Sequence, residues 1–231
     1  MASILTNNGA DTIVRQCIGL MGELDPRKRL YALTVLAGLG SAARTAVPFI
    51  LDALKDELPP VRYLALQVLR EVAPEARVMV PCLIKAVQDP DEAVRRRAVN
   101  MLGDLGPDAR LASAALVQAL QDPCSSVRLS AAAALGEIGP TTATAVSALI
   151  EALRESDVRL RSIILATLVK IGSRAVPRLL DSLHHPDPNV RRYAARAVLK
   201  CPAGADLVDS LTDLLHDPDP LVREDAKEAL Q

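Results

Sequence analysis

The chain has 231 residues, with 27 lysines and arginines against 28 aspartates and glutamates, so its net charge is −1. This balance disfavours proteins that bind nucleic-acid backbones through a basic excess. Half of the residues are hydrophobic but only 2% are aromatic, which disfavours disorder and predicts closely packed helices with small side chains between them.

The N-terminal residues lack the basic region and apolar run of a secretory signal, and no uninterrupted apolar stretch reaches the roughly 20 residues of a membrane span. Cys17, Cys82, Cys124 and Cys201 are far apart, and no pair has metal-ligand spacing. Isolated cysteines are typical of small buried side chains in a reducing compartment. We therefore expect a cytoplasmic protein that contacts no membrane.

An apolar residue followed by arginine recurs along the chain and predicts the repeat. These arginines are Arg29, Arg62, Arg95, Arg128, Arg161, Arg191 and Arg223, spaced by 33, 33, 33, 33, 30 and 32 residues. At the fifth position Leu160-Arg161 is preferred to Val158-Arg159, because it gives Gly172 the offset that Gly139 has in the previous repeat. We expect one domain, residues 1–231, of seven repeats at roughly 11–40, 41–73, 74–106, 107–139, 140–172, 173–202 and 203–231.

Each repeat is predicted to contain two helices. The first helix shows an i, i+3, i+4, i+7 apolar stripe, as in Val146, Leu149, Ile150 and Leu153. The same stripe occurs as Val47, Ile50, Leu51, Leu54 and as Val176, Leu179, Leu180, Leu183. The apolar–arginine pair opens the second helix, where Val94, Ala98, Leu102 and Leu105 recur at helical spacing.

Glycine is predicted to end the second helix in four repeats, at Gly40, Gly106, Gly139 and Gly172. Glycine takes a left-handed C′ conformation without steric cost, and Pro107 and Pro140 follow two of these glycines. Since narrow apolar stripes are buried only when neighbouring repeats stack, the fold class is an all-α, right-handed α-α superhelix.

These repeats resemble the prokaryotic HEAT-like repeats first grouped with phycobilisome lyases. The resemblance lies in the Asp-Pro turn, the Val-Arg pair, the Ala-Ala and Leu-Gly pairs and the opening Ala46-Val47-Pro48 and Ala175-Val176-Pro177. It extends over the chain from about residue 11 and implies the fold. It leaves function open, because such repeats occur in enzymes, adaptors and assembly factors.

In six repeats an acidic residue lies six positions before the arginine of the apolar–arginine pair. The pairs are Glu23 with Arg29, Asp56 with Arg62, Asp89 with Arg95, Asp122 with Arg128, Glu155 with Arg161 and Asp217 with Arg223. The exception is His185 before Arg191, where Asp187 could substitute. We expect each acid to cap its second helix and to accept from an arginine of its own or the adjacent repeat.

No catalytic residue, metal ligand or cofactor site is predicted. Deoxyhypusine hydroxylase, an enzyme built from similar repeats, holds iron through His-Glu pairs, and this chain has no His-Glu dipeptide. His184, His185 and His216 lie in predicted turns, and neither a phosphate loop nor a Ser/His/Asp constellation is present. We therefore do not expect an enzyme.

The second helices of such solenoids line the concave face, and their outward positions define a candidate groove. The predicted partner-binding residues are Tyr31, Tyr63, Leu64, Arg96, Arg97, Leu129, Ile163, Arg192, Tyr193 and Arg196. Tyrosine and arginine are enriched at interface hot spots. The leading hypothesis is a non-catalytic bacterial scaffold that binds a protein or peptide segment, with acidic groups of the partner toward the sixth repeat.

Three alternatives stay open. A bilin-lyase-like enzyme subunit or assembly factor would act on a protein-attached tetrapyrrole. Nucleic-acid binding would use Arg96, Arg97, Arg192 and Arg196, although the net charge disfavours it. An engineered binder is a further possibility, against which the non-identical repeats argue. The seventh repeat ends at Gln231 without a terminal glycine, which fits either a polar cap or a chain that continues.

Overall fold

The computed structural model describes residues 7–139, 143–155, 157–201 and 211–230, and all regular structure in these ranges is α- or 3₁₀-helical. The predicted all-α fold class is confirmed. The chain divides into two compact units, Met1–Met101 and Leu102–Gln231.

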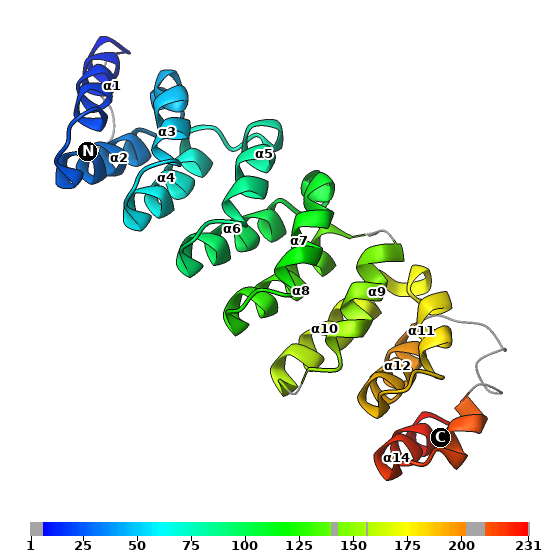
Figure 1. Ribbon diagram of the computed structural model, residues 1–231. Coiled ribbons are helices and arrows are strands. Elements are labelled where there is room, and N and C mark those ends of the chain that lie inside the picture. The colour runs from blue at the N-terminus through cyan, green and yellow to red at the C-terminus, as the bar shows by residue number, and fades with distance from the viewer. Residues whose placement is uncertain (1–6, 140–142, 156, 202–210, 231) are drawn as a thin grey trace. The chain divides into compact units, whose positions relative to one another are not determined.

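The first unit consists of helical pairs with short connections. Its elements are α1 (Asn7–Met21), α2 (Pro26–Leu39), the 3₁₀ helix η1 (Gly40–Ala46), α3 (Val47–Ala53), α4 (Pro59–Val72), α5 (Ala76–Ala86) and the larger part of α6 (Glu92–Leu105). Helix α2 packs against α1 and α4, and α3 packs against α4 (Figure 1). The second helices of consecutive repeats therefore lie side by side.

The second unit repeats this arrangement. Its elements are η2 (Gly106–Ala112), α7 (Ser113–Ala119), α8 (Ser125–Ile138), α9 (Ala143–Ala152), α10 (Val158–Ile171), η3 (Gly172–Arg174), α11 (Val176–Ser182), α12 (Pro188–Lys200), η4 (Leu214–His216) and α14 (Pro220–Ala229). Helices α8, α10, α12 and α14 pack in that order, each on the next (Figure 1). Close approach of α8 and α10 requires Gly136, whose missing Cβ would lie 3.2 Å from Thr167 Oγ1.

Glycine ends the second helices as predicted. Helices α2, α6, α8 and α10 each stop one residue before Gly40, Gly106, Gly139 and Gly172, and all four glycines have positive φ. However, ψ is −132° at Gly40 and −141° at Gly172, which lies outside the left-handed helical region that we expected. This combination is open essentially to glycine alone. The chain continues directly into a 3₁₀ turn at Gly40, Gly106 and Gly172, with Pro107 inside the turn, whereas Pro140 lies outside the described residues.

Of the stripes predicted for the first helices, the one on α9 is fully buried, whereas Val176 and Leu180 of the stripe on α11 are half-buried. Val146, Leu149, Ile150 and Leu153 of the α9 segment are all buried. The choice of Leu160-Arg161 is also confirmed, because Leu160 is fully buried while Val158 is 64% exposed.

The stripe on α3 is only partly covered. Ile50 is buried, but Val47, Leu51 and Leu54 are half-buried. Complete burial of this stripe was therefore a wrong expectation, and the reason lies in a pocket beside α3 that is described below.

Residues Pro26–Ala53 are long and apolar enough to pass a composition test for a membrane span, in contrast to the expectation from uninterrupted apolar runs. The segment is divided at Gly40 into α2, η1 and α3. Leu33, Leu36 and Ile50 are fully buried within the packed helices. These three side chains thus belong to the repeat core, and 28% of the most apolar window of the segment is buried.

Candidate binding surfaces and the arginine ladder

The arginine at the start of each second helix makes a recurring set of bonds, here called a ladder rung. Arg62 donates from Nε and Nη2 to both carboxylate oxygens of Asp89, each at 2.7 Å. Its Nη1 donates to the main-chain carbonyls of Asp56 at 2.8 Å and Glu57 at 3.1 Å. Both side chains of the Arg62–Asp89 pair are 9% exposed. Donation of these hydrogen bonds to Asp89 raises the pKa of Arg62, so the pair stays ionised.

The other rungs show that the acid pairs with the arginine of the preceding repeat. Arg191 donates to Asp217 at 2.7 and 2.8 Å, and Arg29 lies 2.8 Å from Asp56. Arg128 lies 3.2 Å from Glu155, in a more exposed position. Donation by arginine lowers the pKa of Asp217. These rungs join successive repeats, as charged hydrogen bonds between partly buried groups.

The ladder acids do not cap the second helices, which corrects the sequence-based expectation. They accept the N–H two residues on, within the turn: Asp89 accepts from Asp91 at 2.9 Å and Asp217 from Asp219 at 2.8 Å. In five second helices the cap is a second aspartate further along, whereas Leu58 of α4 and Cys124 of α8 form no side-chain cap. The capping residues are Asp25, Asp91, Asp157, Asp187 and Asp219. In those five turns a separate aspartate thus performs the capping role that we had assigned to the ladder acid.

One rung lacks its carboxylate. The position that would pair with Arg161 is His185, and no carboxylate among the described residues forms an ion pair with Arg161. Asp187 does not substitute, because it caps α12 through a 2.8 Å bond from Asn189 N–H. His185 Nδ1 accepts from Asp187 N–H at 3.0 Å, and Nε2 lies 3.3 Å from Glu151. The His185 imidazole therefore accepts the same hydrogen bond within the turn as a ladder acid does. It does not supply a carboxylate to pair with Arg161.

The second-helix face of the first unit presents most of the residues predicted there. Tyr31 is 63% exposed, Arg96 is exposed, and Tyr63, Leu64 and Arg97 are half-buried. The guanidinium of Arg97 lies 5.9 Å from the centre of the Tyr63 ring. Cation–π contact of this kind orients both side chains along the face.

The second-helix face of the second unit centres on Tyr193. Leu129, Ile163, Arg192 and Arg196 are half-buried, but Tyr193 is only 8% exposed, so its expected orientation toward solvent was wrong. Three arginines cover its ring. They are Arg161, Arg192 and Arg196, at 6.0, 6.0 and 5.7 Å from the ring centre. The Tyr193 ring is thus covered by guanidinium groups and is not itself an exposed contact residue.

Charge is not balanced around Tyr193. Arg192 pairs with Asp225 of α14, whereas Arg196, like Arg161, forms no ion pair with any carboxylate in the described ranges. Arg161 belongs to the series of ladder arginines, so its position in the repeat did not predict its place beside Tyr193; it is half-buried, and its Nε donates to the Leu153 carbonyl at 3.1 Å. The histidine at position 185 was the available signal, because it removes the acid that Arg161 would need.

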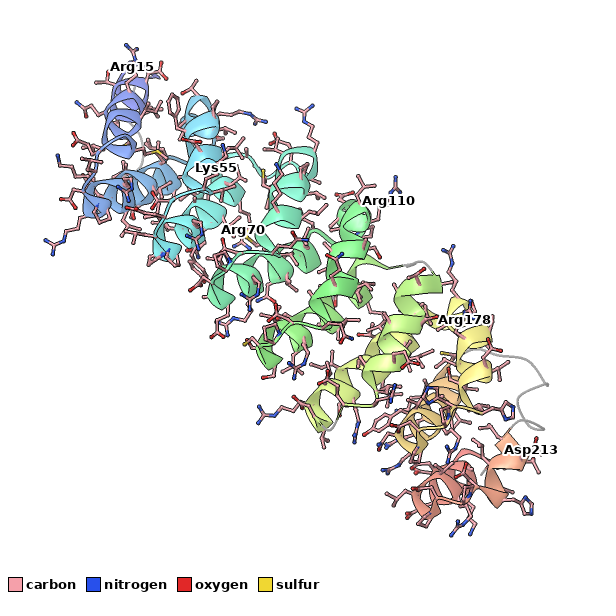
Figure 2. The ribbon with its side chains drawn as sticks, in the orientation of Figure 1. Arg15, Lys55, Arg70, Arg110, Arg178 and Asp213 are labelled. Carbon is pink, nitrogen blue, oxygen red and sulfur yellow. The ribbon has the colours of Figure 1, made fainter. Side chains whose placement is uncertain are left out.

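Pockets lie on the other side of the repeats, between consecutive first helices. One of about 350 Å³ opens between α3 and α5, and a second of about 320 Å³ lies between α1 and α3. A smaller one of about 200 Å³, between α9 and α11, is lined by Glu151, Arg178 and His185. Figure 2 shows Lys55 and Arg178 on these first-helix surfaces. The described residues contain no group of three or more histidine, cysteine or acidic side chains that could hold a metal ion.

Two solved structures with similarity to this chain are an engineered protein and a designed armadillo repeat protein. A crystal structure of an engineered protein matches 94% of this chain and 67% of its own chain, with 22% identity and a TM-score of 0.56. A designed armadillo repeat protein in complex with the peptide (KR)4 matches 94% of this chain and 99% of its own, with 18% identity and a TM-score of 0.47. At these identities the likeness concerns the fold alone.

The sequence itself identifies the family. No curated protein sequence matches the chain. The family model for HEAT repeats matches residues 49–114, 80–168, 113–200 and 146–231, which together span most of the chain. The two-helix repeats, the arginine ladder and this match place the chain in the HEAT-repeat family.

Proposed function

We propose that this protein is a non-catalytic scaffold that binds an extended, acidic segment of a partner protein on its second-helix face. The observation that supports this most is the pair of guanidinium groups, Arg161 and Arg196, that cover Tyr193 without a carboxylate among the described residues. Arginine binds carboxylates through two parallel hydrogen bonds, so a partner's aspartate or glutamate fits this position.

The surroundings favour a peptide chain rather than a free ion. Half-buried Leu129 and Ile163 lie on the neighbouring helices α8 and α10 of the same face, where they can contact apolar side chains of the partner. Arginine beside buried aromatic groups is typical of interface hot spots. On the first unit, exposed Tyr31 and the Tyr63–Arg97 pair offer a second such contact.

The test uses fluorescence anisotropy with labelled peptides that alternate leucine with glutamate, and with a charge-reversed peptide in which lysine replaces glutamate. We expect the acidic peptide alone to bind, and Arg161→Ala with Arg196→Ala to weaken its binding by about 2 kcal/mol, or roughly thirtyfold. The matched control is Arg178→Ala on α11, which pairs with Asp181 at 3.6 Å and lies on the first-helix side. Equal affinity for both peptides, or equal loss in both variants, would reject the proposal.

Other functions have distinct signatures. A bilin-lyase-like activity predicts a spectral shift when bilin is added. Nucleic-acid binding through Arg96, Arg97, Arg192 and Arg196 predicts steep salt dependence, although Arg192 is already paired with Asp225. We also propose a cytoplasmic location, with which the free thiols of Cys17, Cys82, Cys124 and Cys201 are compatible. A prokaryotic origin is proposed from the resemblance of the repeats alone.

A further inference from the structure

The pocket between α3 and α5, here called the α3–α5 pocket, has an apolar interior. Its volume is about 350 Å³, within the usual range of small-ligand sites. Leu51 and Leu54 line one wall, and Leu66 and Val94 lie below. The half-buried state of Leu51 and Leu54 follows from this pocket, because no side chain covers the outer part of their stripe.

Small side chains on α5 create the space. Cys82 and Ala86 are four residues apart and so lie on one face of α5, opposite the leucines of α3. In the second unit the corresponding stripe on α9 is fully buried. The space between consecutive first helices thus varies along the chain, and the α3–α5 pocket is larger than those between α1 and α3 and between α9 and α11.

The mouth of the α3–α5 pocket carries excess positive charge. Lys55 and Lys85 line it, and both are exposed. Lys55 lies 3.1 Å from Asp52, while Lys85 forms no ion pair with any carboxylate in the described part of the chain. Arg62 and Asp89 at the base neutralise each other through their two hydrogen bonds. The ammonium group of Lys85 thus lies beside an apolar cavity and forms no ion pair with any carboxylate of the described residues.

We propose that the α3–α5 pocket binds a small amphiphilic carboxylate. Its hydrocarbon part would fill the space along Leu51, Leu54 and Cys82, and its carboxylate would lie at the ammonium groups of the mouth. Burial of apolar ligand surface provides the main driving force, and the lysines select the negative head group. This site is separate from the second-helix face. A test of carboxylate binding in the pocket is therefore independent of peptide binding on that face.

Cys82 provides a direct reporter of occupancy. Its thiol donates to Val78 carbonyl oxygen at 3.4 Å and is half-buried in the pocket wall. Burial raises the pKa of the Cys82 thiol, so alkylation is followed at mildly alkaline pH. Cys124, which is also half-buried but lies in the second unit, serves as the internal control on the same molecules.

The experiment measures alkylation of each cysteine in the full chain by peptide mass spectrometry, with octanoate or octylamine as probe. At an octanoate concentration about ten times the dissociation constant, we expect Cys82 to react about tenfold more slowly and Cys124 to react unchanged. Octylamine should protect much less. No protection of Cys82, equal slowing of both cysteines, or equal protection by octylamine would each overturn the proposal.

Substitutions test the contributions of the cavity and of its lysines to octanoate binding separately. Ala86→Phe should fill the pocket and abolish protection by octanoate, whereas Ala114→Phe, at an exposed position of α7, should leave it intact. Lys55→Gln and Lys85→Gln should each weaken octanoate binding about two- to fivefold, as expected for exposed charges. These two variants keep the proposal testable if Ala86→Phe does not fold. Unchanged affinity in both would refute the assignment of the carboxylate to the lysines.

Discussion

Replacement of Arg62 by alanine tests whether the ladder holds consecutive repeats together. The change removes two hydrogen bonds to Asp89 and two to main-chain carbonyls in the turn between α3 and α4. Loss of one partner of a buried ion pair costs about 3–5 kcal/mol, because the other charge stays buried. We expect the lower end, about 3 kcal/mol, because Asp89 still accepts from Asp91 N–H and its side chain is 9% exposed.

Urea unfolding followed by far-UV circular dichroism measures this loss, and a shift of the midpoint of about 1 M is expected. The control is Arg70→Ala on the same helix, whose side chain is 42% exposed and whose removal should cost no more than about 0.5 kcal/mol. A double-mutant cycle with Asp89→Ala should give a coupling of about 2 kcal/mol. If Arg62→Ala unfolds at the same urea concentration as Arg70→Ala, the ladder does not stabilise the stack.

Three further substitutions test a glycine conformation, a helix cap and an ion pair. Gly139 has a φ of 85°, so Gly139→Ala should lower the free energy of unfolding by about 1–2 kcal/mol in urea titrations, and an unchanged value would contradict the strained turn. Asp91→Ala removes the cap of α6 and should cost about 1 kcal/mol, against a negligible effect of Glu92→Ala. Because the pKa of Asp217 is lowered in the folded state, its contribution is present above the unfolded value of about 3.9 and is lost as pH falls through the lowered folded pKa. Asp217→Asn should therefore make stability less dependent on pH in acid, and an identical acid profile would exclude this role.

Sequence periodicity predicts the repeat well because burial and helix termination are local properties. The apolar–arginine spacing identifies the starts of the second helices, and positive φ at four glycines confirms their ends. Leu160 rather than Val158 faces the core, as the offset to Gly172 required. Each of these features depends on residues within one repeat.

Features that depend on contacts between repeats could not be read from one repeat. The partner of Arg62 is Asp89, 27 residues later, so the direction of the ladder emerges only from stacking. Tyr193 is buried because arginines from α10 and α12 cover it, although its helical position points outward. The α3–α5 pocket likewise arises from small residues on α5, whereas the half-buried leucines that line it lie on the α3 segment.

The central claim, that an acidic segment binds on the second-helix face, is tested most directly by hydrogen–deuterium exchange with the alternating Leu-Glu peptide. Binding is expected to slow exchange in the part of α12 that holds Arg196 and in the facing part of α10, while α9 and α11 exchange as in the free protein. The protection should disappear in the protein that carries Arg161→Ala and Arg196→Ala. Protection confined to α9 and α11, or protection that persists in the double variant, would contradict the claim.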